Sequence, residues 1–161
     1  MDIVIINGPN LNLLGRREPE KYGSMPFEQF LSTLIPQYPQ ISFSYFQSNY
    51  EGAIIDYVQQ VGFQDDTAIV LNAGGLTHYS VSLRDCIAAI KVPTVEVHLT
   101  DIYSREPFRR CSLLTDVCKH SIIGQGLDGY KQAIEWLLDK YENKAETSYE
   151  RNFEKPKHFG K

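Results

Sequence analysis

A tyrosine and two adjacent arginines lie in a long segment that follows the first apolar run of the chain. The run at positions 3–6, with the sequence IVII, is typical of a buried strand. Connections after such strands usually span about two to six residues, whereas residues 7–23 pass here before the next helix signal. Loops of this length are usually either lids over functional sites or disordered segments. Arg17 and Tyr22 therefore predict a lid that carries chemical groups to the end of the strand.

A tyrosine on this lid could act as a base only in its phenolate form. An unperturbed phenol has a pKa of about 10, so only about one in a thousand is ionised at neutral pH. A neighbouring guanidinium favours the phenolate, and Arg17 lies on the same segment as Tyr22. A tyrosine that packs on its own loop, with the arginines in solvent, is the structural alternative for the same residues.

Two further groups of polar residues follow later apolar runs. The turn from Asn72 to His78, NAGGLTH, could let a ligand approach the backbone at its glycines, and an ordinary strand-to-helix connection explains it equally well. His98 ends the next run, and Glu96, two residues earlier, faces the same side of a strand. Such a carboxylate could fix the imidazole tautomer and support protonation. A structural histidine is the alternative for His98 taken alone.

Arg105 and Arg109 follow the strand that ends at His98, at a spacing of four residues. Side chains at this spacing lie together on a helical turn, where they could meet a carboxylate or form a solvated surface pair. Lys21 is the one lysine in the three polar segments, which disfavours a Schiff-base mechanism. No spacing of Cys, His or acidic residues in the sequence matches a metal site.

The elements that position these groups alternate along the chain. Predicted strands cover residues 3–6, 41–46, 68–71, 94–99 and 118–123, and predicted helices cover residues 26–36, 51–61, 80–91 and 127–141, with a helical turn at 107–110. Ser24 is the predicted N-cap of the first helix. This alternation predicts an α/β, flavodoxin-like three-layer sandwich with a five-stranded parallel sheet of order 2-1-3-4-5. Ligands bind outside the carboxyl ends of the strands in such sheets, so the three polar groups should converge.

Length and composition indicate one globular domain. The chain of 161 residues, of which 42% are hydrophobic and 22% charged, is long enough for a full core, which we assign to residues 1–144. A formal charge of −4 disfavours a general nucleic-acid surface, and no apolar run is long enough to span a membrane. The three cysteines suit a reducing cytoplasm. Residues 145–161 are polar and aperiodic, which predicts a flexible tail or, as the less favoured alternative, a partner-binding segment.

The segment from Gly124 to Gly129 matches the dinucleotide-binding pattern GxGxxG between a predicted strand and a predicted helix. The segment begins the last strand–helix unit of the chain. No further strand follows to complete the βαβ unit that binds a dinucleotide. We therefore predict that these glycines serve turn formation and helix docking rather than cofactor binding. A flavodoxin-like binding module for a nucleotide or FMN is the alternative to an enzyme.

Four segments taken together resemble the type II 3-dehydroquinate dehydratases, and they appear in the family's order: IINGPNLNLLGRREPEKYG, LNAGGLTHYSVSLRD, VEVHLTDIYSREPFRR and IIGQGLDGY. The resemblance covers residues 2 to about 141. It implies a flavodoxin-like hydro-lyase without metal or cofactor, usually a homododecamer assembled from trimers. It also implies elimination of water from 3-dehydroquinate to 3-dehydroshikimate through an enolate, in the shikimate pathway of aromatic amino acid biosynthesis or in quinate breakdown.

The resemblance further implies catalytic roles for five residues. Tyr22 corresponds to the base that removes a proton beside the ketone, and Arg17 to the lid arginine that promotes ionisation of that tyrosine. Asn10 corresponds to the residue that holds a water against the developing enolate. His98 corresponds to the acid that protonates the departing hydroxyl, and Glu96 to its supporting carboxylate.

Substrate-binding positions are implied in the same way. They are Asn72, His78, Arg105, Arg109, the backbone amides of Leu99 and Thr100, and Asp85 reaching a neighbouring subunit's site. Thr100 stands where the family more often has serine, and its backbone amide is unaffected by that difference. The pair at positions 103–104, Tyr-Ser, replaces a commoner His-Ala pair, so no role for that histidine is carried over.

Overall fold

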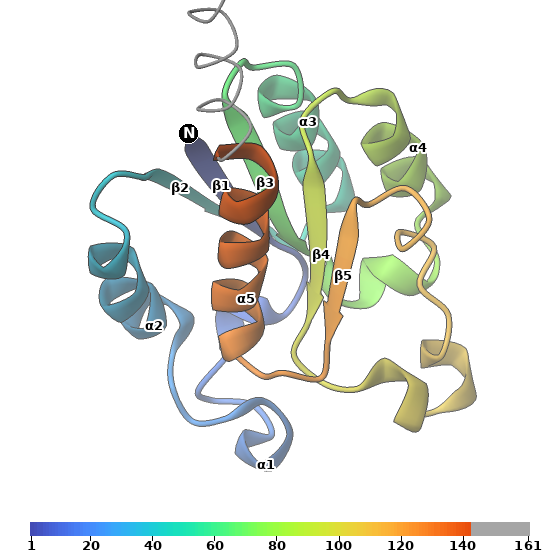
Figure 1. The fold of residues 1–161 in the computed structure, drawn as a ribbon. Coiled ribbons are helices and arrows are strands. Elements are labelled where there is room, and N and C mark those ends of the chain that lie inside the picture. The colour runs from blue at the N-terminus through green and yellow to red at the C-terminus, as the bar shows by residue number, and fades with distance from the viewer. Residues whose placement is uncertain (143–161) are drawn as a thin grey trace, which may run out of the picture.

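One parallel sheet of five strands forms the centre of the structure, a computed structural model that describes residues 1–142 (Figure 1). The strands are β1 (Asp2–Asn7), β2 (Ser42–Gln47), β3 (Thr67–Asn72), β4 (Thr94–His98) and β5 (His120–Ile123). All pairings are parallel and the strand order is β2-β1-β3-β4-β5, so the predicted topology is confirmed. The segment predicted as a tail, residues 145–161, lies outside the described residues.

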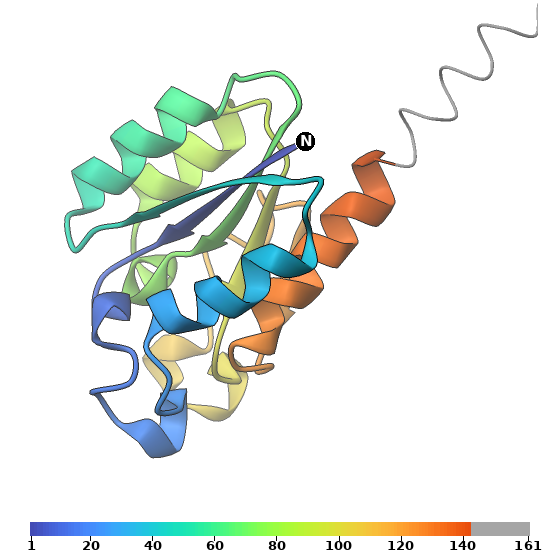
Figure 2. The ribbon, with the colours of Figure 1, turned by 90° about the vertical axis from the view of Figure 1, so that its left-hand side faces the viewer.

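Helices cover both faces of the sheet (Figures 1 and 2). The α-helices are α1 (Pro19–Tyr22), α2 (Phe27–Leu34), α3 (Glu51–Val61), α4 (Val81–Ala89) and α5 (Asp128–Leu137), and η6 (Leu138–Glu142) continues α5 as a π-helical turn. The short 3-10 helices are η1 (Leu11–Leu13), η2 (Ile35–Gln37), η3 (Gly74–His78), η4 (Ile102–Ser104) and η5 (Pro107–Arg109). One face of the sheet packs on α2 and α5 and the other on α3 and α4, which confirms the predicted three-layer sandwich.

The central strands are buried on both faces. Along β1, Ile3 and Ile5 pack into the cluster that contains α2 and α5, whereas Val4 and Ile6 pack into the cluster that contains α3 and α4. Burial of each such side chain contributes roughly 1.5–3 kcal/mol. Strands covered on both sides appear in a sequence as continuous apolar runs rather than as alternating ones. This burial explains why the central strands are visible in the sequence.

The long segment after β1 is more structured than its sequence suggests. The 3-10 helix η1 and the short helix α1 interrupt it, and Tyr22 is the last residue of α1. Pro19 begins α1, where its fixed φ suits the first turn, and Glu18 before it has a positive φ of 33°. The prediction of Ser24 as an N-cap is wrong, because Pro26 occupies the cap of α2 and no side chain bonds the helix end.

The other predicted boundaries agree with the structure to within about two residues, except at the C-terminal end of α5. That helix is α-helical to Leu137 and then widens into the π-helical turn η6, whereas the sequence predicts one helix to residue 141. The strand predicted from residue 118 begins at His120. Ser80, the predicted first residue of α4, is its N-cap and accepts a hydrogen bond from the amide of Leu83.

The carboxyl ends of β1 and β3 form the switch point of the sheet. After β1 the chain adds β2 on one side, and it later adds β3 on the other side of β1. Asn7 and Asn72, the last residues of β1 and β3, are paired in register. In doubly wound sheets ligands bind outside the strand ends at this point. A ligand site is therefore expected among the segments that follow β1, β3 and β4.

Candidate active site

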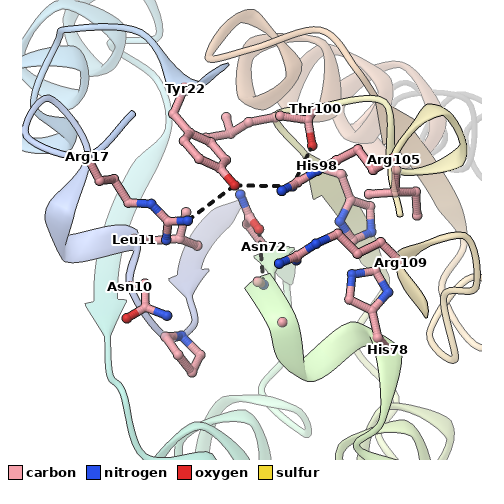
Figure 3. Close-up of a pocket in the computed structure, with 15 residues that line it drawn as sticks. Asn10, Leu11, Arg17, Tyr22, Asn72, His78, His98, Thr100, Arg105 and Arg109 are labelled. Carbon is pink, nitrogen blue, oxygen red and sulfur yellow. Dashed lines mark hydrogen bonds between the residues drawn. The ribbon is translucent and has the colours of Figure 1, made fainter. Parts of the chain in front are cut away.

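A pocket opens at the carboxyl ends of β1, β3 and β4 (Figure 3). The segments after these strands supply its lining, which includes all the predicted catalytic and substrate-binding residues except Glu96 and Asp85. Glu96 is buried on β4 near His98, and Asp85 is exposed on α4 outside the pocket. The three polar segments that the sequence places at one sheet edge therefore do meet there.

The phenolic oxygen of Tyr22 lies between two guanidinium groups (Figure 3). Nη2 of Arg17 is 3.2 Å from it and Nη1 of Arg105 is 3.1 Å from it, and both nitrogens donate to the oxygen. The guanidinium carbon of Arg17 also lies 4.4 Å from the centre of the tyrosine ring. The oxygen therefore accepts two hydrogen bonds from cationic donors, which are stronger than neutral ones. The sequence pointed to Arg17 as the activating group and missed this contact of Arg105.

Arg105 is fixed by neighbours on the segment that follows β4. Its Nη1 also donates to the hydroxyl of Thr100 over 3.3 Å, and its Nε lies 3.6 Å from a carboxylate oxygen of Glu106. The same carboxylate oxygen lies 3.1 Å from Nε of Arg109. Glu106 therefore partly balances two arginines, and Arg17, the third arginine of the pocket, lies 3.4 Å from the carboxylate of Glu18. Within residues 1–142, the lining thus holds three guanidinium groups and no carboxylate, with two carboxylates outside it, and this excess of positive charge suits an anionic ligand such as a carboxylate.

Glu96 forms a buried carboxylate beside His98. The carboxylate accepts hydrogen bonds from the hydroxyls of Thr115 at 2.6 Å and Ser112 at 2.9 Å, and its Oε2 lies 3.5 Å from Nε2 of His98. Burial raises the pKa of Glu96, but contacts with His98 and the two hydroxyls outweigh burial and hold that pKa below its ordinary value. The carboxylate therefore presents a negative charge to Nε2 of His98. Ser112 and Thr115 carry no periodic sequence signal, and sequence reasoning missed them.

This carboxylate should make stability depend on pH in a defined direction. Because its folded pKa is lowered, Glu96 contributes stability above the ordinary carboxyl pKa, and that contribution is lost as the pH falls through the folded value. Glu96→Gln removes the titration while keeping the side-chain shape. We expect thermal midpoints of the wild type and the variant, measured at one protein concentration, to converge as the pH falls below about 4.5. A constant difference between the two across that range would contradict this linkage.

His78 is oriented by the backbone of a neighbouring segment. Its Nδ1 lies 2.8 Å from the carbonyl oxygen of Cys111, and because a carbonyl only accepts, Nδ1 carries the proton. Burial lowers the pKa of His78, and the nearby His98 and two arginines lower it further, against the opposing effect of the carbonyl. The imidazole is therefore neutral, and its Nε2 is available as an acceptor for a ligand hydroxyl.

Backbone groups at the end of β4 complete the pocket. Leu99 and Thr100 line it, and their amides have no acceptor within residues 1–142. Adjacent free amides at a strand end can bind a carboxylate. Asn10 lines the same pocket, and its backbone has a left-handed φ of 69° and donates its amide to the side chain of Asn49. That contact ties the start of the lid to the segment after β2.

The family model described as "Dehydroquinase class II" matches residues 1–138. The chain belongs to this family. The resemblance seen in four sequence segments is thereby confirmed, and so is the prediction of an enzyme family. The comparisons do not favour the alternative of a nucleotide- or FMN-binding module.

This class II dehydroquinase has relatives that match over most of their length. A protein named 3-dehydroquinate dehydratase from Roseiflexus castenholzii is 47% identical over 140 residues, which are 86% of the chain and 88% of the relative. A protein named catabolic 3-dehydroquinase from Botryotinia fuckeliana is 41% identical over 152 residues, which are 90% of the chain and 97% of the relative. The crystal structure of type II dehydroquinase from Butyrivibrio crossotus has a TM-score of 0.80 and 44% identity, covering 85% of the chain and 97% of the other.

Two features of the described part of this class II dehydroquinase concern membranes and metals. Among residues 1–142, no helix has the length and apolar character needed to cross a membrane. In the same part of the chain, no group of three or more His, Cys, Asp or Glu side chains is placed to hold a metal ion.

Proposed function

We propose that this class II dehydroquinase eliminates water from 3-dehydroquinate to give 3-dehydroshikimate through an enolate. The most direct support is that the phenolic oxygen of Tyr22 accepts hydrogen bonds from two guanidinium groups in the pocket that also contains His98. A base and an acid around one ligand space are what an acid–base elimination requires. The reaction serves the shikimate pathway or quinate breakdown, both of which use this step, and we expect it to occur in the cytoplasm.

Tyr22 is the proposed base. As phenolate it takes the proton from the carbon beside the substrate ketone, and the electron pair that remains moves onto the ketone oxygen as an enolate. Arg17 and Arg105 stabilise the phenolate before this step through their hydrogen bonds to its oxygen. Asn10 is proposed to hold a water against the enolate oxygen, where negative charge develops.

His98 is the proposed acid. As the enolate collapses to the ketone, the bond to the hydroxyl breaks, and the hydroxyl takes a proton from His98 and leaves as water. Glu96, 3.5 Å from the imidazole, stabilises its protonated form before the transfer. The proton gained by Tyr22 and the one lost by His98 are then exchanged with solvent, so the net reaction is loss of one water.

The remaining pocket residues are proposed to bind the substrate. The amides of Leu99 and Thr100 hold its carboxylate, and Arg109 adds a positive charge. Asn72 and His78 bind ring hydroxyls, His78 through its unprotonated Nε2.

We infer further that the chain assembles as a homododecamer built from trimers and that Asp85 reaches the pocket of a neighbouring subunit. Asp85 is exposed on α4 and does not line the pocket of its own chain, which leaves it available to a neighbour. Sedimentation of the purified protein should give the mass of a dodecamer rather than of a trimer or a single chain.

The proposed reaction is tested by adding 3-dehydroquinate and following the ultraviolet absorbance of the conjugated enone product. We expect turnover without an added cofactor, and no absorbance change would refute the proposal. Incubation with substrate and borohydride should leave the activity intact, because the enolate route forms no Schiff base that borohydride could trap. Loss of activity under these conditions would contradict the enolate route.

Arg17 and Arg105 should contribute comparably to turnover, because their nitrogens lie at nearly equal distances from the oxygen of Tyr22. Removal of one such preorganised donor typically lowers kcat by roughly 10²–10³, and we expect a loss of this order for both Arg17→Ala and Arg105→Ala. The enone assay measures both losses, and a large loss in only one of the two variants would contradict comparable contributions. Arg16→Ala is the matched control, because Arg16 is exposed and does not line the pocket.

A further inference from the structure

The GxGxxG segment, residues 124–129, leads from the end of β5 into the first turn of α5 and does not line the pocket. Gly124 and Gly126 have positive φ values of 78° and 57°, a conformation that favours glycine. Gly129 lies in the first turn of α5, and a Cβ there would come within 3.2 Å of a methyl group of Val97 on β4. The three glycines therefore let the start of α5 lie directly against the sheet. The next residue, Tyr130, is fully buried.

Tyr130 connects the ends of the two strands at the switch point. Its hydroxyl donates to Oδ1 of Asn7 over 2.7 Å and accepts from Nδ2 of Asn72 over 2.9 Å. Asn7 and Asn72 end β1 and β3 and are paired in register. Both asparagines are almost fully buried. The hydrogen bonds between Tyr130 and these two asparagines therefore form a buried polar bridge at the carboxyl ends of β1 and β3, next to the pocket.

The direction of every hydrogen bond in this bridge is determined. The amide of Gly74 can only donate, and it lies 3.2 Å from Oδ1 of Asn72, so the carboxamide must face it with its oxygen. Nδ2 of Asn72 then faces Tyr130, whose oxygen accepts and whose single proton goes to Asn7. Burial raises the pKa of Tyr130 far above its ordinary value, so this hydroxyl stays neutral and keeps its role as donor.

We propose that Tyr130 is a positioning residue that fixes the carboxamide of Asn72, so that one N–H and one oxygen lone pair face the ligand in a constant orientation. Asn72 lines the pocket, whereas Tyr130 and Asn7 do not. The amide of Gly74 holds the oxygen end of this carboxamide and Tyr130 holds its nitrogen end. Without the hydroxyl the nitrogen end would be free to tilt, which would weaken recognition of a substrate hydroxyl. The GxGxxG segment thus places Tyr130 where its hydroxyl orients the side-chain amide of Asn72. The inference rests on the proposed dehydratase function.

The decisive experiment is a double-mutant cycle on KM for 3-dehydroquinate. Tyr130→Phe keeps the ring but removes the hydroxyl, and we expect it to raise KM roughly fivefold to tenfold, the value of one hydrogen bond, with a smaller change in kcat. Asn72→Ala should raise KM at least as much. In the Asn72→Ala background, Tyr130→Phe should cause no further rise, because its effect passes through the missing carboxamide.

A purely structural role for Tyr130 would give a different pattern. Thermal stability and kcat would then fall with the amount of folded enzyme while KM stayed constant, and that result would overturn the proposal, as would additive effects in the cycle. Tyr38→Phe is the matched control, because Tyr38 is a buried tyrosine whose hydroxyl contacts Glu135 outside the pocket. We expect Tyr38→Phe to leave KM unchanged.

A second variant serves if Tyr130→Phe does not fold. Asn7→Ala removes the acceptor that fixes the proton of Tyr130 and should also raise KM, although residue 7 does not line the pocket. An unchanged KM in this variant would count against the bridge. Failure of the wild type to convert 3-dehydroquinate would instead refute the proposed function, and the inference with it. A wild type that turns over beside variants of unchanged KM would refute the inference alone.

Discussion

Tyr22→Phe should lose nearly all turnover of 3-dehydroquinate while keeping the fold. The phenolic oxygen accepts from two guanidinium groups and is the proposed proton acceptor, and general base catalysis typically contributes about 10²–10⁴ to a rate. The hydroxyl makes no other hydrogen bond within residues 1–142, and the tyrosine side chain is only half-buried. The thermal midpoint should therefore change little. Circular dichroism and the enone assay together measure both effects.

Deuterium exchange separates the role of Tyr22 from a general defect. In heavy water the wild type should exchange the proton beside the ketone as the enolate forms and reverses, and Tyr22→Phe should lose this exchange as well as elimination. Tyr103→Phe is the matched control, because Tyr103 is exposed on η4 and does not line the pocket. Turnover by Tyr22→Phe comparable to that of the wild type would remove Tyr22 from the mechanism.

The sheet and the place of the site could be predicted because their causes are local. Runs such as Ile3 to Ile6 are continuous since the strand is buried on both faces, and the alternation of strands with helices leaves few topologies. Once the order of strands is known, the segments after β1, β3 and β4 must meet at one edge. The sequence positions of Asn72, His98 and Arg17 therefore predict that they lie at this edge, and all three line the pocket.

The contacts that orient the site could not be predicted in this way. Arg105 and Tyr22 are 83 residues apart, and Tyr130 and Asn7 are 123 residues apart, yet each pair shares a hydrogen bond. Neither pair has a periodic pattern that marks its partner, because side-chain reach across a folded edge depends on packing rather than on spacing. The short helix α1 was missed for a related reason, since four residues are too few for a helical repeat.

The glycines of the GxGxxG segment serve the packing of α5 against the sheet. Its position in the last βα unit predicts helix docking rather than dinucleotide binding, and the approach of Gly129 to Val97 agrees with that interpretation. What the pattern alone could not show is that close docking places Tyr130 between the two switch-point asparagines. A sequence feature outside the pocket thus acts on a residue that lines it.

His98→Asn should block elimination at a later step than Tyr22→Phe. The imidazole is the proposed donor to the leaving hydroxyl, and loss of a general acid typically costs about 10²–10⁴ in rate. Proton removal beside the ketone precedes this transfer and depends on Tyr22, whose guanidinium contacts the change at residue 98 leaves in place. The variant should therefore retain deuterium exchange into 3-dehydroquinate while forming almost no enone.

This division of effects is the strongest test of two separate proton-transfer groups in one pocket. If His98→Asn lost exchange and elimination equally, the imidazole would be required for enolate formation itself, and the assignment of Tyr22 as the base acting alone would be wrong. His120→Asn is the matched control, because His120 is exposed on β5, stacks on Trp136 and lies outside the pocket. That variant should exchange and eliminate at the wild-type rate, so that any loss in His98→Asn reports the chemistry at the end of β4.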